Sequence, residues 1–332
     1  MLELLHSEIY NCKETEIKED AILLPNLDHL TVSCNTIKFL RSNAFKNMTH
    51  LKELNLGTNK ISVWPSDVFA PLEVLQFLNL SANNIEKLTG NMFKVIPKLK
   101  ILLLSHNGIN EVEMDVFKNN ADLEELYLNH NLIDLILVKM FNPLKKLTIL
   151  DLANNQLETI TAAFDFNYNL SNLNLSNNII TELPSRIFNS THLEILDLSF
   201  NKISTVYKEV LPFKTLRELY LQNNYISIIC NTPDEFKNSP LNLLDLQNNR
   251  LVFLDTDLIK TAKYLNTVKV ENNPWDCICF EQMQLSLPLE LGEDYRNGEE
   301  PICVNNNRKN YDVSINELEK YYKILEHYWQ LR

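Results

Sequence analysis

Apolar and polar residues alternate along this chain in one pattern that returns at a nearly fixed interval. The pattern LxxLxLxxNxL first appears at Leu27, recurs in steps of 24 residues as far as Leu147, and continues in steps of 23, 23, 23, 25 and 24 residues. Because strand side chains alternate between two faces, the LxL part of each copy predicts a short strand whose leucines point inward. The eleven copies begin at Leu27, Leu51, Leu75, Leu99, Leu123, Leu147, Leu170, Leu193, Leu216, Leu241 and Leu265.

Each copy also carries an asparagine at its ninth position. A buried Asn side chain offers two N–H donors and one acceptor, so it can satisfy backbone groups where the chain leaves a strand. We therefore expect a column of buried asparagines that bridges neighbouring copies. The column consists of Asn35, Asn59, Asn83, Asn107, Asn131, Asn155, Asn178, Asn201, Asn224, Asn249 and Asn273.

A second column, on the segment that follows each strand, is aromatic. Its phenylalanines lie 17 to 20 residues after the start of each copy. We expect them to stack in the core on the convex side rather than to line a ligand site. They are Phe45, Phe69, Phe93, Phe117, Phe141, Phe164, Phe188, Phe213 and Phe236.

These intervals lie within the period of roughly 20–29 residues that defines leucine-rich repeats. One such repeat cannot bury its own apolar face, so the repeats must stack into a curved solenoid with capped ends. The predicted fold is α/β: a leucine-rich-repeat horseshoe with a parallel, concave β-sheet. We divide the chain into an N-terminal cap over 1–26, a solenoid over 27–272, a cysteine-containing C-terminal cap over 273–310 and an amphipathic helical tail over 311–332.

The end of the last repeat carries the most specific motif. The chain reads Asn273-Pro-Trp-Asp-Cys-Ile-Cys279, and Cys303 follows. This motif resembles the C-terminal cap of extracellular leucine-rich-repeat proteins such as Toll-like receptor ectodomains, Slit-type proteins and secreted insect immune proteins. The resemblance covers about 27–303 and implies a disulfide-bearing, partner-binding horseshoe. It further implies a Cys277–Cys303 bond and a lid formed by Trp275, but it leaves Cys279 without a mate.

The other cysteines bear on the compartment. Cys12 precedes the first repeat and Cys34 ends its strand, so a bond between them would tie the N-terminal cap to the solenoid. Six cysteines allow fifteen complete pairings, and the pairing of Cys230 and Cys279 stays open. Cysteines gathered at the two ends suit an oxidising compartment. The alternative is a cytosolic protein with reduced thiols; the spacing does not suit a zinc site.

The concave face is the expected binding surface. Residues between the inward leucines face the concave side, where two groups of apolar and aromatic side chains gather. The alternative is that a few exposed apolar residues are normal on any surface. The first group is Phe77, Ile101, Leu103, Tyr127 and Ile149, and the second is Phe200, Arg217 and Tyr220, beside Asp197 and Asp245.

His106 and His130 occupy one column in adjacent repeats and should be near neighbours. Two adjacent imidazoles repel each other when both are protonated, so ligand binding can respond to pH between roughly 5 and 7. The alternative is a pair of solvated histidines. The pattern supplies no third ligand for a metal ion.

Sequons at Asn47, Asn169 and Asn189 are candidate glycosylation sites. The tail from Ile315 to Trp329 has apolar residues at helical spacing. It either packs on the C-terminal cap or begins a coiled coil with a second chain, forming a homo- or heterodimer.

Charge and missing motifs narrow the function. A net charge of −12 disfavours nucleic acid as a partner, because phosphate binding requires clustered Lys and Arg. We find no apolar run of the roughly 20 residues that span a membrane, no signal peptide, no catalytic motif and no cofactor motif. We therefore expect a non-catalytic ectodomain, extracellular or on the cell surface, that binds a protein or microbial ligand in innate immunity or cell adhesion. The alternative is a cytosolic scaffold or regulatory subunit.

Overall fold

The computed structural model describes residues 5–19, 21–22, 24–160, 163–207, 210–230, 239–252, 254 and 263–276. The predictions for Phe236, Cys277, Cys279, Cys303 and the helical tail over 311–332 lie outside the described residues. So does the C-terminal cap beyond Asp276, and so does the side chain of Cys230.

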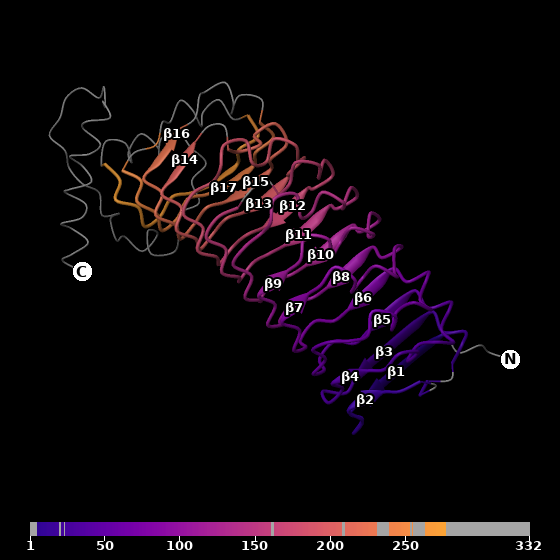
Figure 1. Cartoon of the computed structure of the whole chain (residues 1–332). Helices are drawn as coiled ribbons and strands as arrows, with labels where there is room; N and C mark the ends of the chain where they lie inside the picture. Colours follow the sequence, from indigo (N-terminus) through magenta and orange to yellow (C-terminus); the bar gives the residue numbers. More distant parts are fainter. Residues whose placement is uncertain are drawn as a thin grey trace.

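The predicted parallel sheet is confirmed. Each strand pairs in parallel with the strand of the next coil, and Figure 1 shows the coils stacked in one row from the N-terminal end onward. The sheet has twelve strands rather than eleven, because 6–10 adds a coil before the first repeat. In order they are β1 (His6–Tyr10), β3 (His29–Ser33), β5 (Glu53–Asn55), β6 (Phe77–Asn79), β8 (Ile101–Leu103), β10 (Glu125–Tyr127), β11 (Ile149–Asp151), β12 (Asn172–Asn174), β13 (Ile195–Asp197), β15 (Glu218–Tyr220), β17 (Leu243–Asp245) and β18 (Thr267–Lys269).

The return segments of the coils consist of turns and short strands. Within the described ranges they contain no α-helix, so the helical half of the expected α/β class is not found there. Three two-stranded parallel pairs lie on this side of the coils (Figure 1). They are β2 (Glu16–Ile17) with β4 (Phe39–Leu40), β7 (Lys87–Leu88) with β9 (Glu111–Val112), and β14 (Thr205–Tyr207) with β16 (Ile228–Cys230).

The core is continuous from coil to coil. Inward leucines fill it, and the phenylalanine spine is buried and stacked as expected: ring centroids lie 6.3 Å apart for Phe117 and Phe141 and 6.0 Å apart for Phe141 and Phe164. Trp64 lies between Phe69 and Phe93 in the same row. Burying such rings contributes about 2–3 kcal/mol each, so the spine is a principal source of stability.

The asparagine column forms a hydrogen-bonded ladder. Asn155 is typical: its Nδ2 donates to the carbonyls of Leu128, in the preceding coil, and Leu152, in its own coil, each at 3.0 Å. Its Oδ1 accepts the backbone N–H of Ile133 at 3.0 Å. Each ladder asparagine thus joins two coils through groups that water does not reach. The buried members are Asn59, Asn83, Asn131, Asn155, Asn178, Asn201, Asn224, Asn249 and Asn273, and Asn107 is half-buried.

The first repeat departs from this ladder, and the expectation that Asn35 is buried is wrong. Asn35 is exposed, whereas Cys34 is buried and gives its backbone N–H to Asn59 Oδ1 at 3.2 Å. The structure joins Cys34 to Cys12 in a disulfide, with Cα atoms 5.0 Å apart. The covalent bond occupies the inner position that asparagine fills in the other repeats.

The turn before each ladder asparagine is left-handed. The residue that precedes the asparagine has φ between 52° and 57° in every repeat from the second onward, although left-handed backbone favours glycine and the chain has only 5 glycines. Asparagine tolerates this conformation better than other side chains. The residues are Thr58, Ala82, His106, His130, Asn154, Asn177, Phe200, Asn223, Asn248 and Asn272.

Candidate binding site on the concave face

Each three-residue strand presents two side chains to the concave face. The central leucine or valine is buried, and in most strands the flanking residues are half-buried, for example in β8 and β10. Parallel pairing in register aligns these residues into two rows across the coils. We call the first residues of the strands, such as Phe77 and Ile101, the first column, and the third residues, such as Leu103 and Tyr127, the second column.

The structure brings most of the first predicted group together. Phe77 pairs with Ile101 in the first column, and Leu103 pairs with Tyr127 in the second. Ile101 and Leu103 are on one strand, so these four side chains are contiguous. Ile149 lies two strands beyond Ile101 with Glu125 between them. We call these five residues the apolar patch; all are half-buried.

Two tyrosines on this face are held by carboxylates. The Tyr127 hydroxyl donates to Glu125 Oε2 at 2.9 Å, and the Tyr220 hydroxyl donates to Glu218 Oε2 at 2.8 Å. Burial, and then the hydrogen bond to the carboxylate, raise the pKa of each phenol to about 12. Both hydroxyls therefore stay protonated at neutral pH, and both rings are fixed along their strands.

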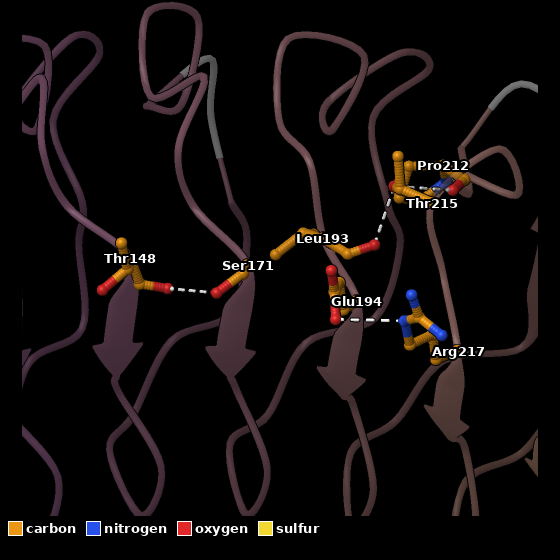
Figure 2. Close-up of polar contacts among 7 residues, drawn as sticks. All are labelled: Thr148, Ser171, Leu193, Glu194, Pro212, Thr215 and Arg217. Carbon is orange, nitrogen blue, oxygen red and sulfur yellow. Dashed lines mark hydrogen bonds and ion pairs between the residues drawn. The ribbon is translucent and has the colours of Figure 1, made fainter.

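The second predicted group is not assembled in the same way. Tyr220 lies in the second column between Asp197 and Asp245. Arg217 precedes the strand, where its Nε donates to Glu194 Oε2 at 3.1 Å (Figure 2). Phe200 is 50% exposed but sits in the left-handed turn beyond the strand, without a ring contact among the described aromatics.

Figure 2 shows how the entry edge of the sheet is tied together. Ser171 Oγ donates to the Thr148 carbonyl at 3.1 Å, and Thr215 Oγ1 donates to the Leu193 carbonyl at 2.8 Å. These bonds join neighbouring coils one to three residues before their strands begin. They hold the concave side chains on a rigid support.

Asparagine and aspartate share one role in the second column. At six positions the side-chain Oδ1 accepts the backbone N–H two residues later, at 2.8–3.1 Å, and closes the end of the strand. Burial raises the pKa of Asp151 and Asp245. Sequence reasoning missed this role, although the recurrence of Asn and Asp in one column was its signal. The six residues are Asn55, Asn79, Asp151, Asn174, Asp197 and Asp245.

The structure stacks two histidine pairs. His106 and His130 have ring centroids 4.1 Å apart, which makes them near neighbours as expected. The ring centroids of His6 and His29 lie 4.0 Å apart on β1 and β3, and His29 Nε2 lies 3.1 Å from Glu53 Oε1. The second pair was missed because no strand was predicted within 1–26. The described residues contain no group of three His, Cys, Asp or Glu side chains able to hold a metal ion.

The three sequons lie on exposed return segments. Asn47 and Asn189 are exposed. Asn169 is exposed too, but its Nδ2 donates to the Lys145 carbonyl at 2.7 Å, a bond that a sugar at this nitrogen would disturb. Among the described residues, no helix is both long and apolar enough to span a bilayer.

Parts of this chain are similar in sequence to Toll-like receptors and to lumican. Toll-like receptor 1 of Homo sapiens is 28% identical over 161 residues, which are 46% of this chain and 18% of the receptor. Lumican of Bos taurus is 33% identical over 181 residues, which are 53% of this chain and 45% of lumican. The chain thus spans less than half the length of either relative.

Among solved structures, that of a TLR13–ssRNA13 complex superposes with a TM-score of 0.63 and is 26% identical. The match covers 80% of this chain and 43% of that one. A family model described as leucine rich repeat matches 25–85, 97–163 and 168–229, which together exceed half of the chain. The chain therefore belongs to the leucine-rich-repeat family.

Proposed function

We propose that this chain is a non-catalytic binding module that recognises a protein or microbial ligand through its concave sheet, in a secreted or cell-surface protein of innate immunity or cell adhesion. The observation that carries the proposal is the apolar patch on a rigid parallel sheet, with Tyr127 fixed at its edge. Aromatic anchors of this kind dominate the binding energy of protein interfaces. A fixed side chain also loses little conformational entropy on binding.

The extracellular part of the proposal is supported by the Cys12–Cys34 disulfide and by exposed sequons at Asn47 and Asn189. Non-reducing peptide mapping of the protein from its native source tests it. A Cys12–Cys34 or Cys277–Cys303 peptide, with sugar at either asparagine, is the expected result. Free thiols and bare asparagines would instead favour the cytosolic scaffold.

Photo-crosslinking tests the concave site. A benzophenone amino acid at position 127 should capture a specific protein from the native source, whereas the same amino acid at exposed Leu135, on a return segment, should not. The purified partner should then lose at least about tenfold in affinity when Phe77 and Tyr127 are both replaced by Ala. A matched Val63→Ala/Leu135→Ala variant should bind within about twofold of the parent. Equal losses in the two variants would discard the concave site.

The stacked His106–His130 pair supports pH-dependent binding as a further part of the proposal. His130 is also coupled electrostatically to the Asp151 carboxylate, whose pKa it lowers. Affinity should change between about pH 7 and 5, because a positive charge gained by this pair alters the surface that the ligand meets. His106→Asn keeps a residue suited to the left-handed turn and should flatten that profile; an unchanged profile would remove the histidines from the site.

A further inference from the structure

The second column carries more charge than the fold requires. Asn55, Asn79 and Asn174 accept the same strand-ending N–H that Asp151 and Asp197 accept. Where a second-column side chain supplies this acceptor, a neutral amide supplies it as well as a carboxylate does. The negative charges at Asp151, Asp197 and Asp245 therefore have no structural purpose in the strand-ending turn.

Two of these three charges, on Asp151 and Asp197, have no ion-pair partner among the described residues, and Asp245 has only Lys269 Nζ at 3.8 Å. Glu125 and Glu218 accept tyrosine hydroxyls but likewise contact no described cation. Burial raises the pKa of Asp151 and Asp245, so a cation that approaches from outside would favour the ionised form of these two groups.

The entry edge of the same sheet provides an internal contrast. There, one residue before the strands, charges on neighbouring coils are paired: Lys52 with Asp28 at 3.0 Å, Lys100 with Glu124 at 3.5 Å and Arg217 with Glu194 at 3.1 Å. The chain neutralises its edge carboxylates in cis. On the concave face, Asp151 and Asp197 have no such partner among the described residues.

The spacing of the three second-column carboxylates is regular, although Asp151 and Asp197 are half-buried and Asp245 is buried against Lys269. Asp151, Asp197 and Asp245 lie on alternate strands, with Asn174 and then Tyr220 between them. Two strand spacings place consecutive carboxylates about 10 Å apart. Tyr220, fixed by Glu218, offers an aromatic ring between two of them, an arrangement that attracts Arg and Lys side chains.

We propose that the concave face from β10 to β17 binds a Lys- and Arg-rich segment of a protein partner; this inference rests on the proposed function of the concave sheet. The apolar patch over β6–β11 receives the apolar anchor of that partner, and the Asp151 and Asp197 carboxylates, with the Tyr220 ring beside Asp197, receive its cations. Phosphate-bearing partners such as RNA are repelled by the same charges.

A labelled nona-arginine peptide is the probe, and fluorescence anisotropy is the measurement. Asp151→Asn/Asp197→Asn/Asp245→Asn keeps the strand-ending hydrogen bonds and should weaken binding at least about tenfold. The control removes the same number of charges from exposed return segments through Asp134→Asn/Glu158→Gln/Glu182→Gln, and should weaken binding less than about twofold. Equal losses in the two triple variants would overturn the inference, because binding would then follow net charge alone.

A gain-of-charge variant guards against misfolding as an explanation. Asn174→Asp adds a carboxylate between Asp151 and Asp197 and should tighten nona-arginine binding about two- to threefold at low salt. In 1 M salt the difference should disappear. Unchanged or weaker binding of nona-arginine by the Asn174→Asp variant at low salt would contradict the inference. The inference would also be contradicted if the Asn triple variant bound an oligouridine RNA more tightly than the parent binds nona-arginine.

Failure of this inference is separable from failure of the proposed function. If the partner captured at position 127 still depends on Phe77 and Tyr127 but ignores the Asn triple variant, the concave module stands and the basic-partner inference falls. If both variant sets leave that partner's affinity unchanged, the concave module itself falls.

Discussion

Two columns of this solenoid both use a side-chain Oδ1 as a hydrogen-bond acceptor, but only one of them also requires Nδ2 donors. The ladder column is interior, and nearly every described member is a buried asparagine whose Nδ2 donates to two backbone carbonyls. The second concave column meets solvent on one side and uses only Oδ1, so Asn and Asp interchange there. The ladder requires donors and an acceptor, so only asparagine serves there. The second concave column uses only an acceptor, so an aspartate can take that position and its negative charge can act on a ligand.

The largest loss of stability should come from placing an aspartate in the ladder column. Asn155→Asp removes the donors to the Leu128 and Leu152 carbonyls and places a carboxylate oxygen against them. We expect a loss of about 3–5 kcal/mol in urea unfolding. The matched Asn174→Asp change should stay within about 0.5 kcal/mol of the parent. Similar losses of unfolding free energy in the two variants would show that the two columns do not differ in their need for the Nδ2 donors.

The first repeat, where a disulfide replaces the ladder, should give the next effect. Cys12→Ala/Cys34→Ala should lower the free energy of unfolding by about 2–4 kcal/mol. Hydrogen exchange should accelerate in β1 and β3 but not in β10, because solenoid coils depend mainly on their neighbours. Uniform acceleration along the chain would show that the bond supports the whole rod.

A smaller effect of opposite sign is expected on the concave face. Burial raises the pKa of Asp151, so ionising this group costs more in the folded than in the unfolded chain. Asp151→Asn should therefore stabilise the protein at pH 7 by up to about 0.5 kcal/mol. That gain should vanish as the pH falls through the raised pKa to the ordinary value, where both states are protonated. A gain that persists at pH 3 would contradict the assignment.

The smallest change in stability is expected for Glu125→Gln, whose main effect should appear in the ultraviolet titration of Tyr127. Glu125→Gln keeps an acceptor for the Tyr127 hydroxyl but removes the negative charge, so stability should change by less than about 0.3 kcal/mol. The Tyr127 pKa should fall below its present value of about 12 in an ultraviolet titration. Glu86→Gln, on a return segment, is the control, and it should leave the titration unaltered.

Periodicity alone predicted the parallel sheet, the stacked phenylalanine spine from Phe45 to Phe188 and all of the ladder except its first member. It failed at β1, where Ser7 stands in register with Leu30 and only Ile9 keeps the inward apolar pattern. It also misplaced Asn35, because spacing does not show that Cys34 takes the inner position. On the concave face, alternation identified which residues share a face, but the carboxylate partners of the tyrosines depend on side-chain geometry that spacing does not contain.

The left-handed turns have a consequence for how this chain tolerates mutation. Thr58, Ala82 and Phe200 hold a backbone conformation that their side chains resist, while equivalent turns in other repeats use asparagine. Replacing each with asparagine should relieve strain without disturbing the inward leucines. Because the stability of a solenoid is close to a sum of repeat and neighbour contributions, gains in separate repeats should add. Stabilising substitutions in these turns can therefore offset the loss of stability caused by changes among the binding residues of the concave face.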